Sequence, residues 1–278
     1  MLKSSIYKKS KYSIYPHVKN RRGVTRLLSY LGRLSRIGVE KINSEPEPIY
    51  EKEWDNLIIF DACRHDLFEE VTKGEVEKRI TVGGGTPKYI ENTFSERNFD
   101  DIVYVTANPW FSPEKFKNLT GREPEDVFHT IFHSYKDKWD ESKSTVLPEK
   151  VLEDLKTAEK LFPEKRKIVH FLQPHHPFVG SSIDEADSEG FGLTSNTESV
   201  WNKAEKGLVD REAVWDAYAK NLEFVLPFSE KVSEIIDGRT VLTSDHGNLV
   251  GENSLYGHPE DSKAKVLREV PWDVISED

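Results

Sequence analysis

The sequence is poor in cysteine and has no long apolar segment. Its 278 residues include one Cys, Cys63, which excludes a disulfide framework and a zinc site built on paired cysteines. No uninterrupted apolar run approaches the roughly 18 residues that a membrane-spanning helix needs. Because hydrophobic residues at 36% and aromatic residues at 11% argue against general disorder, we expect a soluble globular protein with one large α/β domain or two small ones.

Acidic residues are absent from the start of the chain. Residues 1–36 contain ten Lys and Arg, whereas positions 37–278 contain 29 basic and 49 acidic residues, a net charge of −20. The basic start also lacks the compact apolar region of a secretory signal. We therefore expect no export, a cytoplasmic address and no nucleic acid partner.

Residues 24–36 have the spacing of an amphipathic helix, with arginines between the apolar positions. The apolar positions are Val24, Leu27, Leu28, Leu31 and Leu34. Such a helix can lie on an anionic membrane surface or on nucleic acid, or it can dock its leucine stripe on the domain. We favour docking on the domain and keep a peripheral membrane contact through residues 1–36 as the alternative.

An acidic, proline-bearing segment at residues 43–53 predicts a linker. The chain is therefore predicted to divide into residues 1–53, with the basic arm, the amphipathic helix and the linker, and residues 54–278, with the main domain. Inside the main domain, the long polar stretch at residues 180–203 predicts a loop over the site, and a disordered segment is the alternative.

Four short apolar runs, rich in β-branched residues, predict buried strands. They are residues 57–60, 102–105, 168–172 and 240–243. Helical patterns lie between them at residues 148–162 and 210–236. Because the runs do not alternate apolar with polar residues, they indicate a doubly wound α/β fold, with a mostly parallel sheet and helices on both faces. Ligands in this fold class bind beyond the carboxyl ends of the strands.

Polar side chains follow each of these strands where that rule expects a site. They are Asp61, Asn108, His175 with His176, and Asp245 with His246. Asp61, Asp245 and His246 together offer two carboxylates and an imidazole, a ligand set for one Zn, Mn or Mg ion, or less naturally Ca. The alternative is that Asp61 caps the next helix and that residues 245–247 form a turn with a solvated His.

A glycine run before a predicted helix offers a second component. Residues 81–87 read Thr-Val-Gly-Gly-Gly-Thr-Pro, so the backbone N–H groups of Gly84 and Gly85 can approach a phosphate or sulfate. A cation at the neighbouring ligands would lower the pKa of the Thr86 hydroxyl, which makes Thr86 a candidate nucleophile and a fourth ligand. The alternative is a glycine loop in which Thr86 is an ordinary helix N-cap.

Several further side chains are candidates for substrate contact. His175 can be a ligand, a hydrogen-bond donor or the acid for a leaving group, and His258, on a turn, can reach the same pocket. One of His175 and His176 is expected to be a buried, satisfied histidine. Arg64 either pairs with Asp66 to support the loop or touches the substrate anion, and Asn108 is a further substrate contact.

The order of these motifs resembles the sulfatase branch of the alkaline phosphatase superfamily over residues 54–272. The motifs are Asp-x-x-Arg-x-Asp at residues 61–66, Thr86-Pro87, Pro-His-x-Pro-Phe at residues 174–178 and Thr-Ser-Asp-His-Gly at residues 243–247. The resemblance implies that Asp61, Asp245 and His246 bind the metal. It also implies that Thr86 occupies the nucleophile position and that His175 and His258 contact the transferred group or the leaving oxygen.

Two departures from the family pattern refine the prediction. The Cys-x-Pro-x-Arg pattern that yields formylglycine in sulfatases is absent, so a plain Thr nucleophile is more like the phosphatase and phosphotransferase members. The Asp of a two-metal Asp-x-x-x-His pair is also absent, which favours one metal. We predict a hydrolase of phosphate or sulfate esters acting on a small-molecule, glycan or lipid ester. A phosphotransferase and an inactive metal-binding homologue are the alternatives.

Overall fold

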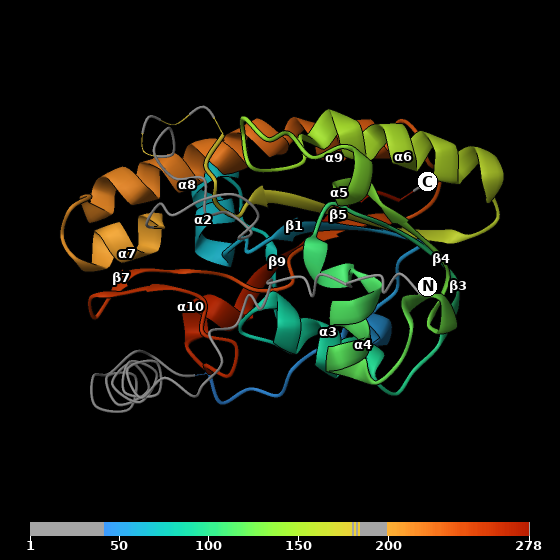
Figure 1. Ribbon diagram of the computed structural model, residues 1–278, viewed down its shortest axis with the longest axis horizontal. Helices are drawn as coiled ribbons and strands as arrows, with labels where there is room; N and C mark the ends of the chain where they lie inside the picture. Colours follow the sequence, from blue (N-terminus) through green and yellow to red (C-terminus); the bar gives the residue numbers. More distant parts are fainter. Residues whose placement is uncertain (1–41, 180, 182, 184–198, 278) are drawn as a thin grey trace, which may run out of the picture. The chain divides into compact units, whose positions relative to one another are not determined.

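A seven-stranded sheet forms the centre of the computed structural model, which describes residues 42–179, 181, 183 and 199–277 (Figure 1). The strands lie in the order β2-β9-β6-β1-β5-β3-β4. Their bounds are β1 Asn56–Asp61, β2 Glu77–Ile80, β3 Phe99–Thr106, β4 Phe128–His133, β5 Arg166–Pro174, β6 Thr240–Thr243 and β9 Glu269–Ser276. Neighbours are parallel from β6 to β4, and β9 is antiparallel to β2 and β6. The predicted fold class is confirmed.

The four predicted strands are β1, β3, β5 and β6, and they occupy adjacent positions in the sheet. Continuous apolar sequence suits them because both of their faces are covered. In β1, Ile58 and Phe60 pack in the core on one face, whereas Leu57 and Ile59 pack in the core on the other. The carboxyl ends of these strands therefore meet at one edge, between two apolar layers.

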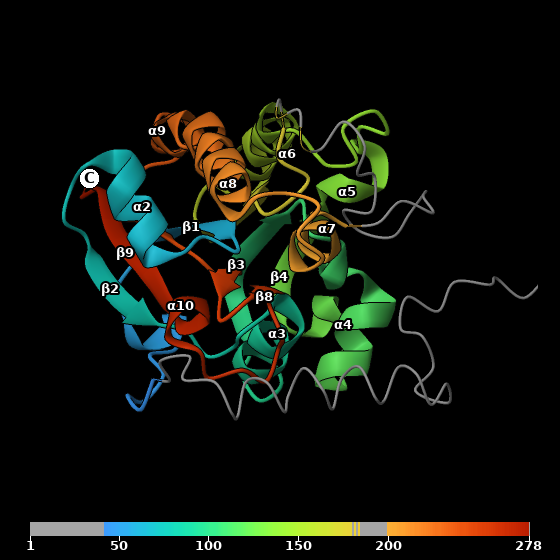
Figure 2. The same cartoon turned by 90° about the vertical axis from the view of Figure 1, so that its left-hand side faces the viewer.

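Helices form a layer on each face of the sheet (Figures 1 and 2). On one face lie α2 (His65–Thr72), α6 (Pro148–Leu161), α8 (Arg211–Val225) and α9 (Pro227–Ser233). On the other lie α3 (Thr86–Phe94) and α4 (Pro113–Thr120). Shorter elements complete the described chain: α5 Ser134–Asp137, α7 Val200–Glu205, α10 Lys265–Arg268, the hairpin of β7 Leu249–Glu252 and β8 Leu255–Gly257, and 3-10 turns at Ile49–Glu51, Pro109–Phe111 and Pro124–Asp126.

Two local predictions were wrong. The helix predicted at residues 210–236 is two helices, α8 and α9, because Pro227 cannot donate a backbone hydrogen bond and begins a new helix. Residues 200–203, predicted as loop, begin α7, whose Ser199 caps it by accepting from the Asn202 N–H. Residues 184–198 of that predicted loop lie outside the described residues.

The predicted basic arm and amphipathic helix lie outside the described residues, so the division of the chain at residues 53 and 54 stays a prediction. The described residues belong to one unit, Glu40–Asp278. The segment before β1 contacts the sheet, since the Glu47 N–H donates to the carbonyl of Ile80, the last residue of β2, at 2.8 Å. Within the described ranges, every helix falls short of the length and apolar character that crossing a bilayer requires.

Candidate metal centre and active site

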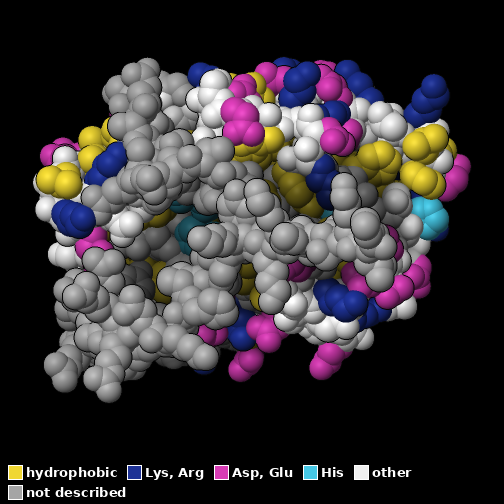
Figure 3. Space-filling model, in the orientation of Figure 1, with side chains coloured by type: hydrophobic (Ala, Val, Ile, Leu, Met, Phe, Trp, Pro, Cys, Tyr) yellow, Lys and Arg dark blue, Asp and Glu magenta, His cyan; other side chains and the backbone are white. Residues whose placement is uncertain are grey.

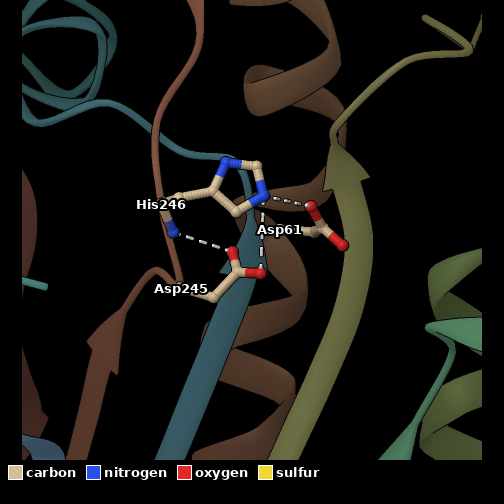
Figure 4. Close-up of side chains that lie close together, drawn as sticks. All are labelled: Asp61, Asp245 and His246. Atoms are coloured by element: carbon tan, nitrogen blue, oxygen red, sulfur yellow. Dashed lines mark hydrogen bonds and ion pairs between the residues drawn. The ribbon is translucent and has the colours of Figure 1, made fainter. Parts of the chain in front are cut away.

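Asp61, Asp245 and His246 converge at the carboxyl edge of the sheet (Figure 4). Asp61 ends β1, and the other two residues follow β6, the strand beside it. All three side chains are fully buried, and their ligand atoms lie within 4.8 Å of one another. His246 Nε2 is 3.6 Å from Asp61 Oδ1 and 3.6 Å from Asp245 Oδ2.

The hydrogen bonds of His246 show which ring nitrogen faces the carboxylates without a proton. Its Nδ1 lies 2.8 Å from the Gly247 carbonyl oxygen, which can only accept, so Nδ1 carries a hydrogen, and in the tautomer that binds a metal the lone pair is on Nε2. Nε2 then presents its lone pair to two carboxylate oxygens. Asp61 Oδ1 has no hydrogen-bond partner in the described part of the chain. Three electron-pair donors that face one point fit a divalent cation.

The pKa values of the two carboxyl groups are shifted in opposite directions. Burial, followed by the charge of Asp245, raises the pKa of Asp61 well above its ordinary value. Burial also disfavours the charged form of Asp245, but His246, His170 and the hydrogen bonds from Ala62 and Thr86 outweigh it and lower that pKa. Both groups can stay ionised together when a cation offsets their repulsion.

The turn after β1 fixes the Asp245 carboxylate. Ala62 adopts a left-handed conformation with φ 60°, which costs about 1 kcal/mol for a residue other than glycine. Its N–H donates to Asp245 Oδ1 at 3.0 Å, and its carbonyl accepts from the Tyr218 hydroxyl. The same Oδ1 accepts from the His246 N–H at 3.0 Å. These bonds hold Oδ1 and leave Oδ2 directed at Thr86.

Thr86 lies at the start of α3 and is only 4% exposed. Its hydroxyl donates to Asp245 Oδ2 at 2.7 Å and lies 3.3 Å from His246 Nε2. The helix cap is Gly85, and Thr86 makes no capping bond, so the alternative of an ordinary N-cap is not observed. The structure therefore brings the predicted nucleophile to the three predicted metal ligands.

Asn108, which follows β3, connects Thr86 to Asp61. Its Oδ1 accepts from the Trp110 N–H at 2.8 Å, which turns Nδ2 towards the centre formed by Asp61, Asp245, His246 and Thr86. Nδ2 donates to Asp61 Oδ2 at 2.5 Å and lies 3.4 Å from Thr86 Oγ1. Asn108 is thus placed beside the centre, as predicted from its position after a strand.

His175 and His258 lie next to the centre. The ring centroids of His246 and His258 are 4.6 Å apart, and those of His258 and His175 are 5.1 Å apart. Burial is the main cause that lowers the pKa of His175 to about 4 and the pKa of His258 well below its ordinary value. Because both rings are neutral at pH 7, they can donate a hydrogen bond or offer a lone pair. This environment favours those roles over the predicted acid role.

Solved structures share the architecture of this chain. The soluble domain of lipooligosaccharide phosphoethanolamine transferase A from Neisseria meningitidis superposes with a TM-score of 0.51 at 16% identity, covering 78% of this chain and 75% of that one. The integral membrane form of the same transferase from that organism superposes with a TM-score of 0.51 at 14% identity, covering 90% of this chain and 54% of that one. This chain shares the α/β fold of these two structures. The resemblance drawn from the motifs is therefore confirmed at the level of the fold.

A third solved structure is also similar to this chain. It is the C-terminal periplasmic domain of a phosphoethanolamine transferase from Campylobacter jejuni, with a TM-score of 0.49 and 17% identity, covering 78% of this chain and 76% of that one. The predicted cytoplasmic address is wrong, because the two neighbours from Neisseria meningitidis are an integral membrane protein and its soluble domain. No protein-family model matches the chain, and no curated protein matches it.

Two glycines of the predicted glycine loop, Gly83 and Gly84, allow close packing within the protein. The Gly84 N–H donates to the Glu260 carbonyl at 3.1 Å, so it is already engaged within the protein. A Cβ at Gly84 would lie 2.9 Å from the Ser262 carbonyl oxygen, and one at Gly83 would lie 2.4 Å from the Tyr89 nitrogen. Gly84 thus allows residues 259–262 to approach the glycine loop, and Gly83 allows that loop to approach α3. Anion binding by the Gly85 N–H stays a prediction.

Arg64 and His176 are held by other side chains. The Arg64 guanidinium bonds to both Asp66 carboxylate oxygens and to Glu252, and it lies over the Trp215 ring at 4.8 Å. We assign it to the support of the loop, the first of its two predicted roles. His176 accepts from the Trp201 indole N–H at 2.9 Å, which makes it the buried, satisfied histidine of the pair. Their substrate contacts stay predictions.

The prediction from sequence missed His170, which is fully buried in β5. Its Nε2 lies 3.7 Å from Asp61 Oδ2. His170 lies inside an apolar strand rather than after one, so a search for polar residues that follow strands does not find it. Its register opposite Ile59, two residues before Asp61, is the signal that places it on the same face as the ligand.

Proposed function

We propose that this chain is a metal-dependent enzyme that transfers or hydrolyses a phosphate ester group and uses Thr86 as its nucleophile. The observation that carries the proposal is the buried Thr86 hydroxyl, 2.7 Å from Asp245 Oδ2 and 3.3 Å from His246 Nε2. A hydroxyl side chain beside three converging ligands is the arrangement that nucleophilic catalysis with a cation needs.

The residues that would hold the cation are Asp61, Asp245, His246 and Thr86. A bound divalent ion supplies a lower pKa for the Thr86 hydroxyl and compensation for charge on the ester oxygens. One imidazole with two carboxylates suits Zn or Mn better than Ca, which prefers oxygen ligands only.

The side chains of the centre have separate parts in the reaction. Thr86 Oγ1 attacks phosphorus, so a bond from Oγ1 to phosphorus forms while the bond from phosphorus to the leaving oxygen breaks. The hydroxyl proton is released to solvent, and the leaving oxygen takes up a proton from solvent and departs as an alcohol. Asp245 Oδ2 accepts the hydrogen bond of the hydroxyl and orients it. Asn108 Nδ2 lies 3.4 Å from Oγ1 and can donate to the incoming oxygens. Water or an acceptor alcohol then attacks the phosphorylated Thr86 and restores its hydroxyl.

The substrate we propose is an ester on a lipid or a glycan. The support for this class is the fold shared with a lipooligosaccharide phosphoethanolamine transferase. A transferase needs an acceptor alcohol where a hydrolase needs only water, so product analysis separates the two reactions. A catalytically inactive metal-binding homologue is the alternative that the same experiment tests.

The test uses Thr86→Ala with Thr93→Ala as a matched control. Thr93 is a second buried threonine of α3, and its hydroxyl has no hydrogen-bond partner in the described structure. We expect Thr86→Ala to lower turnover by about 10⁴-fold or more while elemental analysis shows metal retained. Thr93→Ala should keep turnover. The assay covers a phosphomonoester, a phosphodiester and a sulfate ester, with mass spectrometry for phosphate on Thr86.

Two outcomes would count against the proposal. If Thr86→Ala retains wild-type turnover on the ester that the wild type uses, Thr86 is not the nucleophile. If the wild type binds metal but turns over none of the three esters, the inactive metal-binding homologue is favoured.

A further inference from the structure

His170 lies beneath the centre in a fully buried position on β5, between β1 and β3. The Tyr104 hydroxyl of β3 lies 3.1 Å from its Nδ1, and Phe111 packs edge-on against its ring at 5.6 Å between centroids. Its Nε2 has no hydrogen-bond partner in the described structure and lies 3.7 Å from Asp61 Oδ2. A buried polar nitrogen without a partner costs about 1–3 kcal/mol, so its place calls for an explanation.

The Tyr104 hydroxyl decides the direction of the hydrogen bonds. If it donates to Nδ1, the single hydrogen of the neutral ring is on Nε2 and faces the Asp61 carboxylate. In the opposite arrangement, the Nε2 lone pair would face that carboxylate and be repelled. The first arrangement places the Nε2 hydrogen against a carboxylate oxygen, so it is the one that the contacts of His170 favour.

The two oxygens of Asp61 have different surroundings. Oδ2 accepts from Asn108 Nδ2 at 2.5 Å and faces His170 Nε2. Oδ1 has no hydrogen-bond partner among the described residues and faces His246 Nε2 at 3.6 Å. Donors from the protein thus gather on one oxygen and leave the other directed at the remaining metal ligands.

We propose that Tyr104 and His170 form a chain of donors that positions Asp61 for metal binding, with His170 donating from Nε2 to Asp61 Oδ2. This inference rests on the proposed metal-dependent function. The distance of 3.7 Å is about 0.5 Å beyond the usual limit of a hydrogen bond, so a small rotation of either side chain closes it. His170 is a positioning residue in this scheme, because it acts on the metal through Asp61.

The experiment compares His170→Gln with His170→Asn. The amide nitrogen of Gln extends to the place of imidazole Nε2, whereas that of Asn reaches only the place of Nδ1. Both variants lose the ring that packs on Phe111, so packing losses are matched. Affinity for Zn²⁺ and for Mn²⁺ is measured by calorimetry on metal-free protein, and the melting temperature of the same metal-free protein monitors folding.

We expect His170→Asn to lower metal affinity by about 10- to 100-fold, the usual effect of removing a partner of a metal ligand. His170→Gln should restore affinity to within about threefold of the wild type, while both metal-free variants melt at similar temperatures. Equal affinity in the wild type and both variants would overturn the inference. An equal loss in both variants would also overturn it, because the donor at the Nε2 place would then have no effect.

A spectroscopic test is independent of metal binding. ¹⁵N NMR of the wild type should show His170 with its proton on Nε2, and Tyr104→Phe should weaken this tautomer preference. A proton on Nδ1 in the wild type would overturn the proposed direction. If the wild type binds neither Zn²⁺ nor Mn²⁺, the proposed function fails, and the NMR result still decides the hydrogen-bond chain.

Discussion

His133 shows how a single half-buried imidazole makes stability depend on pH. It ends β4, its Nδ1 lies 3.1 Å from the Tyr135 hydroxyl, and its Nε2 has no partner among the described residues. Burial, followed by the charge of Lys136, lowers the pKa of His133 to about 4. Protonation would add a second buried N–H beside a cation, so the folded state favours the neutral ring.

The pH dependence that follows has a definite sign. The pKa of a histidine in the unfolded chain is about 6.5, so the unfolded chain binds more protons than the folded one between about pH 6.5 and 4. The contribution of His133 to the free energy of unfolding is therefore fully present above pH 6.5 and decreases as the pH falls to about 4. Urea unfolding should show a smaller loss between pH 7 and 5 for His133→Gln than for the wild type. An equal loss in the free energy of unfolding for both proteins would contradict this account. Between pH 7 and 8, the free energy of unfolding should change equally in both proteins.

Residues that lie after strands could be found from the sequence, whereas residues inside strands could not. Asp61, Asn108 and Asp245 follow apolar runs, and the carboxyl ends of parallel strands lie at the same edge of the sheet. Their proximity could therefore be predicted. His170 and Arg79 are charged or polar groups within strands, and their roles depend on register. Arg79 in β2 donates to the Ser244 carbonyl at 2.8 Å, so it supports the Asp245 loop from a position that sequence alone does not connect to it.

At the scale of elements, strands covered on both faces could be found from the sequence, whereas the edge strand β2 and its neighbour β9 could not. β1 and β5 are mostly apolar in their central residues, but β2 reads Glu-Lys-Arg-Ile and β9 contains Pro271. Such strands form because a neighbour offers an open edge, and their exposed positions can be charged. The break between α8 and α9 was predictable from Pro227, whose missing N–H ends a helix.

Contact between α10 and the loop after β6, residues 244–248, gives an element-scale prediction. A Cβ at Gly247 would lie 2.1 Å from the Val266 carbonyl oxygen, so Gly247→Ala must separate α10 from the loop that carries Asp245 and His246. We expect a loss of about 1–3 kcal/mol in the free energy of unfolding and weaker metal binding. Denaturant unfolding and calorimetry measure the two effects.

Gly121 provides the matched control. It ends α4 with φ 76°, and a Cβ there would meet nothing within 4 Å. Gly121→Ala should cost about 1 kcal/mol through backbone strain alone and leave metal affinity at the wild-type value. If both substitutions changed metal affinity equally, the packing of α10 would not be the cause.

At the scale of the whole molecule, charge is divided between the start of the chain and the rest. Acidic and basic side chains are interspersed on the described surface visible in Figure 3. Positions 37–278 nevertheless have a net charge of −20, and residues 1–36 have ten basic residues and no acid. An anionic membrane would attract the first part and repel the second.

This division predicts binding to anionic vesicles through the basic segment. The full chain should sediment with phosphatidylglycerol vesicles at low ionic strength and much less at high salt, because salt screens the attraction. Each basic residue near an anionic surface contributes about 1 kcal/mol, so replacing Lys3, Lys8, Lys9 and Lys11 with Gln should weaken binding by at most roughly 1000-fold. Replacing Lys143, Lys150, Lys160 and Lys165 with Gln changes the net charge equally and should have little effect. Similar binding by the two variants would show that net charge, and not the basic segment, controls the membrane contact.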